Sequence, residues 1–167
     1  ISSNLNRKMV IASSASTYGN GENGFNDSLN DIEKLKPLNS YGLSKQLADL
    51  YLKSKNYLSE ILSLKFFNIF GVNEFHKGEM RSIAHWGIDS VIKNKSIRLF
   101  KSDNKLYKDG EQVRDFLDAD KAVAIMDYLI NNATGIYNIG CGETISWREM
   151  ATTIIDSLKQ KQKNIQF

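Results

Sequence analysis

The sequence of 167 residues contains one cysteine, Cys141, and one proline, Pro37. A single cysteine excludes an internal disulfide and is typical of a protein of the reducing cytoplasm. No apolar run approaches the roughly 20 residues of a membrane-spanning helix, so we expect no membrane partner. The two histidines, His76 and His85, have no further ligands at suitable spacing, so we expect no metal site.

The sequence also has little excess charge: 22 Lys and Arg against 19 Asp and Glu give +3. These charges are scattered, which argues against a nucleic-acid partner; only the run RLFKSDNKLYK (98–108) is locally basic. A hydrophobic content of 41% and a charged content of 25% are those of a globular chain with a core.

Hydrophobic patterning predicts an α/β fold in which strands alternate with amphipathic helices. A buried strand, a helix and a second buried strand open the chain, which indicates a parallel crossover. The predicted helix begins after a cap at Asn39 or Ser40, with an apolar face of Leu43, Leu47, Leu50 and Tyr51. We expect strands at 8–14, 61–67, 96–100, 111–116, 135–140 and from 164. Besides the helix after Asn39 or Ser40, we expect helices at about 81–94, 118–132 and 146–159.

The stretch YGLSK places Tyr41 and Lys45 at i and i+4, on one face of the first predicted helix. A tyrosine hydroxyl has an ordinary pKa near ~10, so a tyrosine that acts as a base near neutral pH needs help. A neighbouring ammonium group favours the phenolate, and a cationic nicotinamide ring favours it further. The pair alone also occurs by chance in helices that have no catalytic role.

A second candidate group lies in SSASTYG (13–19), directly after the first predicted strand. Open α/β sheets bind ligands at the carboxyl ends of their strands. A hydroxyl there, that of Ser14, could hydrogen-bond the same substrate oxygen that Tyr41 deprotonates. The alternative is that these serines only terminate a strand.

The order strand–SSxxxYG, YxxxK, strand–FFNIFG, then RDF (114–116) and YNIGCGE (137–143), resembles the extended short-chain dehydrogenase/reductase superfamily. This superfamily includes the nucleotide-sugar epimerases and dehydratases. The resemblance implies the C-terminal part of an NAD(P)-binding, Rossmann-like doubly wound parallel sheet, with a smaller α/β substrate-binding domain. It assigns 1–67 and about 118–144 to the NADP-binding domain, and about 68–117 and 145–167 to the substrate-binding domain.

The segment NIFGVNEFHKGEM (68–80) resembles the ADP-L-glycero-D-manno-heptose 6-epimerase family, and the likeness covers nearly the whole chain. That family places a second catalytic lysine in HKG. The resemblance therefore implies Tyr41 and Lys77 as paired acid/base residues, with Ser14 assisting and Lys45 holding the nicotinamide ribose. Tyr41, Lys45, Lys77 and Ile69 would contact NADP.

The same resemblance implies the substrate contacts, which are Asn68, Glu79, Trp86, Phe100, Lys101 and Arg114. Arg114 offers the forked donor that suits a diphosphate, although an ion pair with Asp115 or Asp118 would also explain it. Two positions depart from the family pattern. Glu79 replaces a serine, and Trp86 replaces a histidine, with His85 one place earlier.

No GxxGxxG motif for binding a dinucleotide occurs, and the first residue is Ile1 rather than a methionine. We therefore expect a fragment that lacks the family's first ~100 residues and a C-terminal tail, and that is inactive alone. The intact protein is expected to be a cytoplasmic homo-oligomer. It would epimerise ADP-D-glycero-β-D-manno-heptose at carbon 6 by transient oxidation with bound NADP, for lipopolysaccharide core synthesis.

Two alternatives stay open. One is another nucleotide-sugar epimerase or dehydratase, although a dehydratase normally has a carboxylate where Ala15 and Ser16 stand. The other is a non-catalytic nucleotide-binding protein on the same scaffold, which would have no need of Tyr41, Lys45 and Lys77 together.

Overall fold

The computed structural model describes residues 8–102 and 107–164. The chain divides into two compact units, each a mixture of helices and strands. Unit 1 comprises Ile1–Phe67 and Asp120–Gly140, and unit 2 comprises Asn68–Ala119 and Cys141–Phe167. The predicted α/β class is confirmed.

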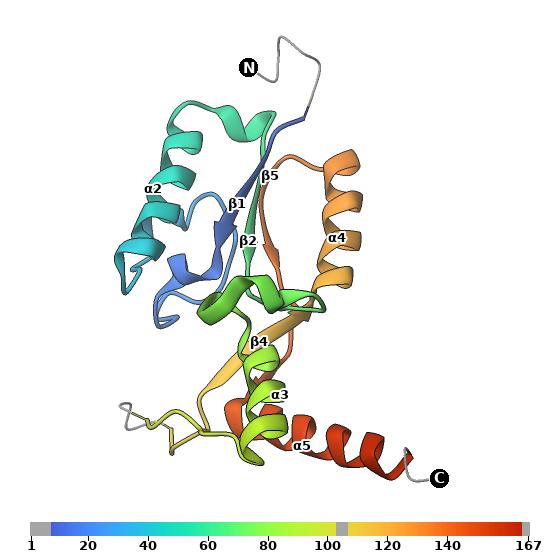
Figure 1. Ribbon diagram of the computed structural model, residues 1–167. Helices are drawn as coiled ribbons and strands as arrows, with labels where there is room; N and C mark the ends of the chain where they lie inside the picture. The colour runs from blue at the N-terminus through green and yellow to red at the C-terminus, as the bar shows by residue number, and fades with distance from the viewer. Residues whose placement is uncertain (1–7, 103–106, 165–167) are drawn as a thin grey trace. The chain divides into compact units, whose positions relative to one another are not determined.

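Unit 1 contains a sheet of three parallel strands in the order β1-β2-β5. Ser14 pairs with Phe66, and Phe66 pairs with Ile139, so the carboxyl ends of all three strands lie at one edge. Figure 1 shows α2 and α4 on opposite sides of this sheet. The elements are β1 (Val10–Ser14), η1 (Ala15–Tyr18), η2 (Ile32–Lys34), α2 (Ser40–Ser54), η3 (Tyr57–Ser59), β2 (Leu62–Phe66), α4 (Ala119–Asn132) and β5 (Gly135–Ile139).

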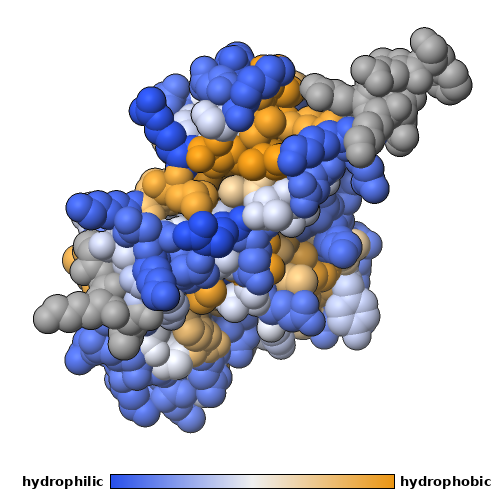
Figure 2. Space-filling model, turned by 90° about the horizontal axis from the view of Figure 1, so that it is seen from below, coloured by the Kyte–Doolittle hydropathy of each residue, from blue (hydrophilic) through white to orange (hydrophobic). Residues whose placement is uncertain are grey.

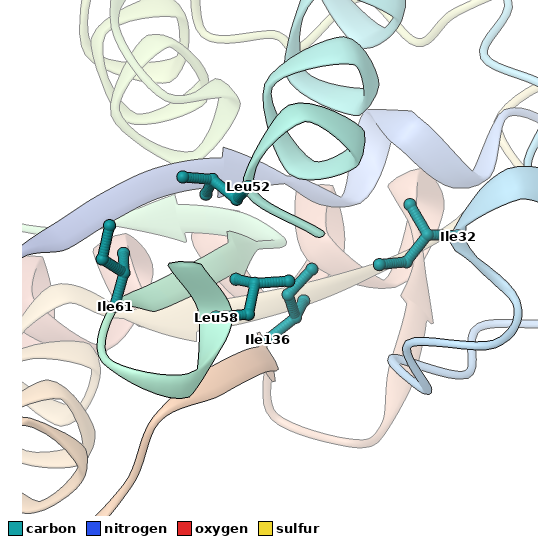
Figure 3. Packing of buried hydrophobic residues seen from close by; sticks show 5 residues of the cluster. All are labelled: Ile32, Leu52, Leu58, Ile61 and Ile136. Atoms are coloured by element: carbon teal, nitrogen blue, oxygen red, sulfur yellow. The ribbon is translucent and has the colours of Figure 1, made fainter. Parts of the chain in front are cut away.

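The hydrophobic core of unit 1 is formed by Ile32 of η2, Leu52 of α2, Leu58 of η3, Ile61 directly before β2 and Ile136 of β5 (Figure 3). Burying an aliphatic side chain of this size contributes about 1.5–3 kcal/mol, so this cluster stabilises the parallel sheet.

Helix α2 begins as predicted, because the Asn39 side chain accepts a hydrogen bond from the backbone N–H of Gly42. Its predicted apolar face is wrong. Leu43, Leu47 and Tyr51 are 46%, 56% and 56% exposed, and only Leu50 packs against the core. The buried side of α2 instead carries Gly42, Gln46, Asp49 and Leu52, so the stripe of Leu43, Leu47 and Tyr51 is turned outward.

Unit 2 contains a parallel pair, β3 with β4, and an antiparallel pair, β4 with β6. Its elements are β3 (Asn68–Phe70), η4 (Glu74–Met80), α3 (Ile83–Asn94), β4 (Val113–Asp118), β6 (Thr144–Ser146) and α5 (Trp147–Asn164). Helix α5 begins with reciprocal bonds, since Ser146 Oγ accepts from Glu149 N and Glu149 Oε2 accepts from Ser146 N.

Several predicted elements of unit 2 need correction. Residues 96–100 form no strand. A backbone hydrogen bond from Gly110 N to Phe100 O joins this segment to the residues before β4. The short strand β6 was not predicted, and α5 continues to Asn164 instead of ending near Lys159. Asn164 is helical, and the remainder of the strand predicted from there lies outside the described residues.

No helix within residues 8–102 and 107–164 has the length and apolar character needed to cross a membrane. Several large hydrophobic side chains are nevertheless exposed, and on the face drawn in Figure 2 hydrophobic residues lie at the surface between hydrophilic ones.

Candidate functional site

The residues predicted to act as a catalytic group in unit 1 come from β1 and α2. Ser14 is the last residue of β1, at the edge where the parallel strands end, and its Oγ accepts from the backbone N–H and from the Oγ of Ser16. This arrangement caps η1 and holds the Ser14 hydroxyl at the strand end. Ligands of open parallel sheets bind at this edge.

Tyr41 and Lys45 occupy the first two turns of α2. The Lys45 ammonium group lies 5.7 Å from the centroid of the Tyr41 ring and donates a 2.8 Å hydrogen bond to the Ala12 carbonyl of β1. Tyr41 is 56% exposed, so this residue is accessible to a ligand. The structure therefore brings Tyr41 and Lys45 together and ties the lysine to the strand that ends at Ser14.

A different tyrosine lies close to the same strand end, but its environment suits a structural role. Tyr18 is 2% exposed, and its hydroxyl donates a 2.7 Å hydrogen bond to Asn138 Oδ1. Burial raises the pKa of Tyr18 well above its usual value, although the hydrogen bond to Asn138 opposes the shift. Of these two tyrosines near the strand end, Tyr41 is the exposed one.

Lys77 lies on η4 of unit 2, next to the buried carboxylate of Glu74. The distance from Lys77 Nζ to Glu74 Oε2 is 3.4 Å, and the Lys77 side chain is 46% exposed. Gly78 follows with φ 52° and ψ −124°, a conformation that residues with a Cβ rarely adopt. The glycine of HKG is therefore needed for the chain to turn directly after the lysine.

Glu74 organises this segment. Its carboxylate accepts hydrogen bonds from Gly71 N, at 3.0 Å, and from Ser82 N and Ser82 Oγ, both at 2.7 Å. Burial by itself raises the pKa of Glu74, but these hydrogen bonds and the charge of Lys77 outweigh it and lower the pKa to about 2. The negative charge is therefore retained at all moderate pH values.

Three of the predicted substrate residues line an open pocket of about 370 Å³ in unit 2: Glu79, Trp86 and Phe100. A volume of this size is within the range of small-molecule sites. Arg81 and Arg98 also line it, and neither was singled out from the sequence. Arg98 opens the basic run at 98–108 and lies two residues before Phe100, which was the available signal.

The two arginines differ in what holds them. Arg81 donates to Asp89 Oδ2 and to the Gly78 carbonyl, each at 2.7 Å. Arg98 is exposed and has no hydrogen-bond or ionic partner among the described residues. The guanidinium of Arg98 is thus available to an anionic ligand.

The remaining predicted residues of unit 2 lie outside that pocket. Asn68 donates a 2.8 Å bond to the Asp115 carbonyl, and Ile69 follows it on β3. Lys101 is exposed. Arg114 donates to the Val113 carbonyl and lies 6.0 Å from the Trp147 ring. The Asp115 carboxylate instead accepts from the backbone N–H groups of Cys141 and Gly142.

A parallel sheet with a serine at a strand end and a Tyr-x-x-x-Lys pair on the following helix is the arrangement expected of the extended short-chain dehydrogenase/reductase superfamily. A family model for the NAD dependent epimerase/dehydratase family matches residues 2–140, and the chain belongs to this family.

The chain is similar to two curated proteins named ADP-L-glycero-D-manno-heptose-6-epimerase. It is 40% identical over 156 residues to that of Nitratidesulfovibrio vulgaris, covering 92% of the chain and 48% of the relative. It is 42% identical over 151 residues to that of Fusobacterium nucleatum, covering 87% and 46%. The resemblance to the ADP-L-glycero-D-manno-heptose 6-epimerase family, first seen in the sequence motifs, is confirmed.

The crystal structure of ADP-L-glycero-D-manno-heptose-6-epimerase from Helicobacter pylori matches the fold with a TM-score of 0.76 at 25% identity, covering 93% of this chain and 47% of that one. The chain thus spans about half the length of the curated relatives that it matches.

Proposed function

We propose that the intact protein is a nucleotide-sugar epimerase that converts ADP-D-glycero-β-D-manno-heptose to its L-glycero epimer at heptose carbon 6. The observation that carries this proposal is the 40–42% identity to relatives bearing that name, over most of this chain. In the proposal, unit 1 belongs to the NADP-binding domain and unit 2 to the substrate-binding domain. The product would serve lipopolysaccharide core synthesis in the cytoplasm, and the enzyme would be a homo-oligomer.

The residues of unit 1 fit the nicotinamide end of a dinucleotide cofactor. Tyr41 is exposed, the Lys45 ammonium group lies beside its ring, and Ser14 ends a parallel strand at the edge where such sheets bind ligands. Lys45 would hold the ribose, and Ile69 of unit 2 would lie against the cofactor. When bound, the cofactor supplies the redox chemistry of the reaction, taking up two electrons and returning them.

In the proposed reaction, one residue of the pair Tyr41 and Lys77 takes the proton of the carbon 6 hydroxyl as that carbon is oxidised to a ketone. Ser14 donates a hydrogen bond to the same oxygen, and the positive charge of Lys45 favours negative charge on the phenol oxygen. After the ketone presents its other face, the other residue of the pair returns a proton to the oxygen as the carbon is reduced. One residue of the acid/base pair then serves each orientation of the ketone.

The pocket in unit 2 suits the nucleotide part of the substrate. Trp86 and Phe100 offer aromatic surface to a base, and Arg98 offers a forked donor to a diphosphate. Glu79 adds a negative charge to the lining, which the two arginines offset. Asn68, Lys101 and Arg114 complete the proposed substrate contacts outside the pocket.

The test is incubation of the full-length enzyme and NADP with ADP-D-glycero-D-manno-heptose, followed by proton NMR for the L-glycero epimer. We expect conversion without net consumption of cofactor. Conversion of UDP-sugars alone would instead support a different epimerase of the family. Absence of turnover with every nucleotide sugar, despite NADP binding, would support the non-catalytic alternative.

The Tyr41→Phe variant tests the mechanism, with Tyr51→Phe as a matched control. Both tyrosines lie on α2 and are 56% exposed, so the two changes remove equivalent hydroxyl groups from one helix. We expect Tyr41→Phe to abolish turnover while sparing NADP binding, and Tyr51→Phe to retain both. Undiminished turnover in a Tyr41→Phe/Lys77→Met variant would refute the assignment of the acid/base pair.

A further inference from the structure

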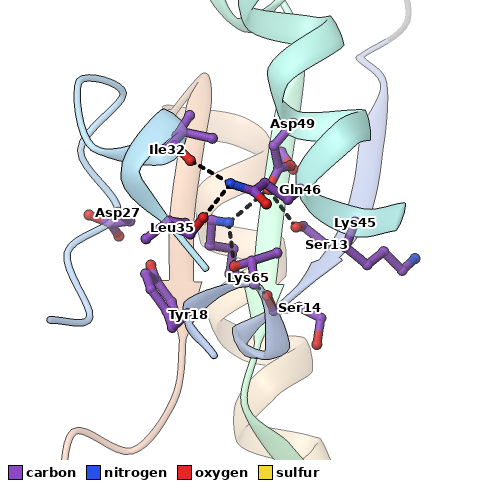
Figure 4. A network of polar contacts seen from close by, with 12 residues as sticks. Ser13, Ser14, Tyr18, Asp27, Ile32, Leu35, Lys45, Gln46, Asp49 and Lys65 are labelled. Atoms are coloured by element: carbon purple, nitrogen blue, oxygen red, sulfur yellow. Dashed lines mark hydrogen bonds and ion pairs between the residues drawn. The ribbon is translucent and has the colours of Figure 1, made fainter. Parts of the chain in front are cut away.

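Helix α2 carries the proposed catalytic tyrosine and lysine, yet its buried side is largely polar. Gln46 and Asp49 are buried there, together with Gly42 and one leucine, Leu52. Gln46 Nε2 donates to the carbonyls of Ile32 and Leu35, at 3.0 and 2.9 Å, as Figure 4 shows. Leu43 and Leu47 of the same helix are exposed while these polar side chains are buried. A helix that packed only for stability would bury leucines in preference to polar residues, so Gln46 and Asp49 need another explanation.

Asp49 and Lys65 form an ion pair in the interior of unit 1. The distance from Lys65 Nζ to Asp49 Oδ2 is 2.8 Å, and both side chains are 0% exposed. Asp49 also accepts hydrogen bonds from Ser13 Oγ, at 2.7 Å, and Ser63 Oγ, at 2.8 Å. One carboxylate therefore joins α2 to both β1 and β2 (Figure 4).

The ammonium side of the pair leads to the strand end at Ser14. Lys65 Nζ donates a 2.8 Å hydrogen bond to Thr17 Oγ1, and Thr17 Oγ1 donates a 2.9 Å bond to the Ser14 carbonyl. Thr17 is fully buried, so water does not compete for these bonds. A continuous chain of contacts thus runs from α2 through β2 to the backbone of the serine that faces the substrate in the proposed reaction.

Such a network is better suited to fixing geometry than to adding stability. Removing two charges from water offsets most of their attraction, and replacing a buried ion pair by apolar groups is often neutral or stabilising. Apolar contacts, however, tolerate sliding and rotation of a helix against a sheet. Directional hydrogen bonds, such as those that Asp49 and Lys65 make with each other and with their neighbours, do not.

We propose that Asp49 and Lys65 are positioning residues, which hold Tyr41 and Lys45 on α2 in register with Ser14 at the end of β1. This inference rests on the proposed function for its kinetic consequence only; the geometric role concerns unit 1 by itself.

The kinetic test uses the full-length enzyme with the paired replacement Asp49→Asn/Lys65→Met, which removes both charges and leaves neither unpaired. We expect kcat to fall by about tenfold to a hundredfold, because an error of about 1 Å in a catalytic group has effects of this order. The KM for the nucleotide sugar should change by less than about twofold, because neither residue is proposed to contact the bound substrate. Thr17→Val, which breaks only the link to Ser14, should lower kcat less and leave the melting temperature near that of the wild type.

The control is Ile136→Ala in the core of the same unit, which removes packing without touching the polar network. At a melting temperature equal to or below that of the paired variant, it should retain wild-type kcat. Equal losses of kcat in the two variants would mean that the pair acts only through stability, and wild-type kcat in both the paired variant and Thr17→Val would also overturn the proposal.

A second readout does not need turnover. 3-Fluorotyrosine placed at position 41 should give one narrow fluorine NMR resonance in the wild type and in Ile136→Ala, and a broadened or multiple resonance in the paired variant. If the wild-type protein epimerised no nucleotide sugar, the proposed function would be wrong. The width of the fluorine resonance would still decide whether Asp49 and Lys65 position Tyr41. An unchanged narrow resonance in the paired variant contradicts that role.

Discussion

Replacing Glu74 by glutamine should destabilise unit 2 at neutral pH. The Glu74 side chain is 6% exposed, and each carboxylate oxygen faces hydrogen-bond donors. Oε1 faces Gly71 N and Ser82 Oγ, and Oε2 faces Ser82 N and Lys77 Nζ. Glutamine has the same shape but only one oxygen. Whichever way its amide is turned, the NH₂ group faces at least one donor, and the charge-assisted bonds are lost.

The pKa of Glu74 sets the size of the effect. The folded protein lowers this pKa from its ordinary value of 4.5 to about 2. At ~1.4 kcal/mol per pKa unit, the shift corresponds to about 3 kcal/mol of stability. A lowered carboxyl pKa contributes this stability fully above the unfolded pKa and loses it as the pH falls, here between about pH 5 and pH 2. We therefore expect Glu74→Gln to lose up to about 3 kcal/mol at pH 7 and much less at pH 2–3.

The measurement is urea unfolding followed by tryptophan fluorescence at pH 7, 5 and 3. Both tryptophans, Trp86 and Trp147, belong to unit 2, so the signal reports on the unit that contains Glu74. The control is Glu79→Gln, which neutralises an exposed carboxylate on the same segment and should change stability little at any pH. If the free energies of unfolding of Glu74→Gln and the wild type ran parallel from pH 7 to pH 3, the hydrogen-bonded carboxylate would not be what stabilises this segment.

Two further changes test the site from other directions. Gly42→Ala should lower the melting temperature, because its Cβ would lie 2.6 Å from the Ser16 carbonyl oxygen and overpacking costs about 1–3 kcal/mol. This cost exceeds the ~1 kcal/mol by which alanine favours a helix over glycine. An increase in melting temperature would contradict this reasoning. Arg98→Ala should weaken ADP binding to the full-length protein by about tenfold or more, since a hydrogen bond to a charged group contributes ~1.5–3 kcal/mol. Titration calorimetry measures this loss, with Lys121→Ala on α4 as the control for charge, and equal affinities of the two variants would exclude Arg98 from the nucleotide site.

Local patterns were sufficient for most of the fold. The run KMVIASS became β1, and the Asn39 cap set the start of α2. Both signals depend on neighbouring residues alone, so they can be read without knowing what packs against them. The strand predicted at 96–100 failed because alternation of apolar residues is necessary for a strand but does not supply a partner. No described strand pairs with this segment.

The motif YxxxK predicted which residues share a helix face, and the structure places Tyr41 and Lys45 side by side, as this spacing requires. The same helix shows where periodicity misleads. Leu43, Leu47 and Tyr51 form a regular apolar stripe, but they are exposed. Periodicity identifies the apolar side of a helix, but it does not determine whether that side is buried in the folded chain.

The sequence by itself determined the α/β class and the family. It also indicated the candidate residues: Tyr41 and Lys45 from their spacing, Ser14 from its place after a strand, and Lys77 from the resemblance to the family. Only the tertiary structure decided that α2 meets the sheet through Asp49 and Lys65, and that Glu74 holds the segment of Lys77. The physical reason is that Asp49 and Lys65 are 16 residues apart. Whether two such charges are surface groups or a buried pair depends on which side of a helix the folded chain turns inward.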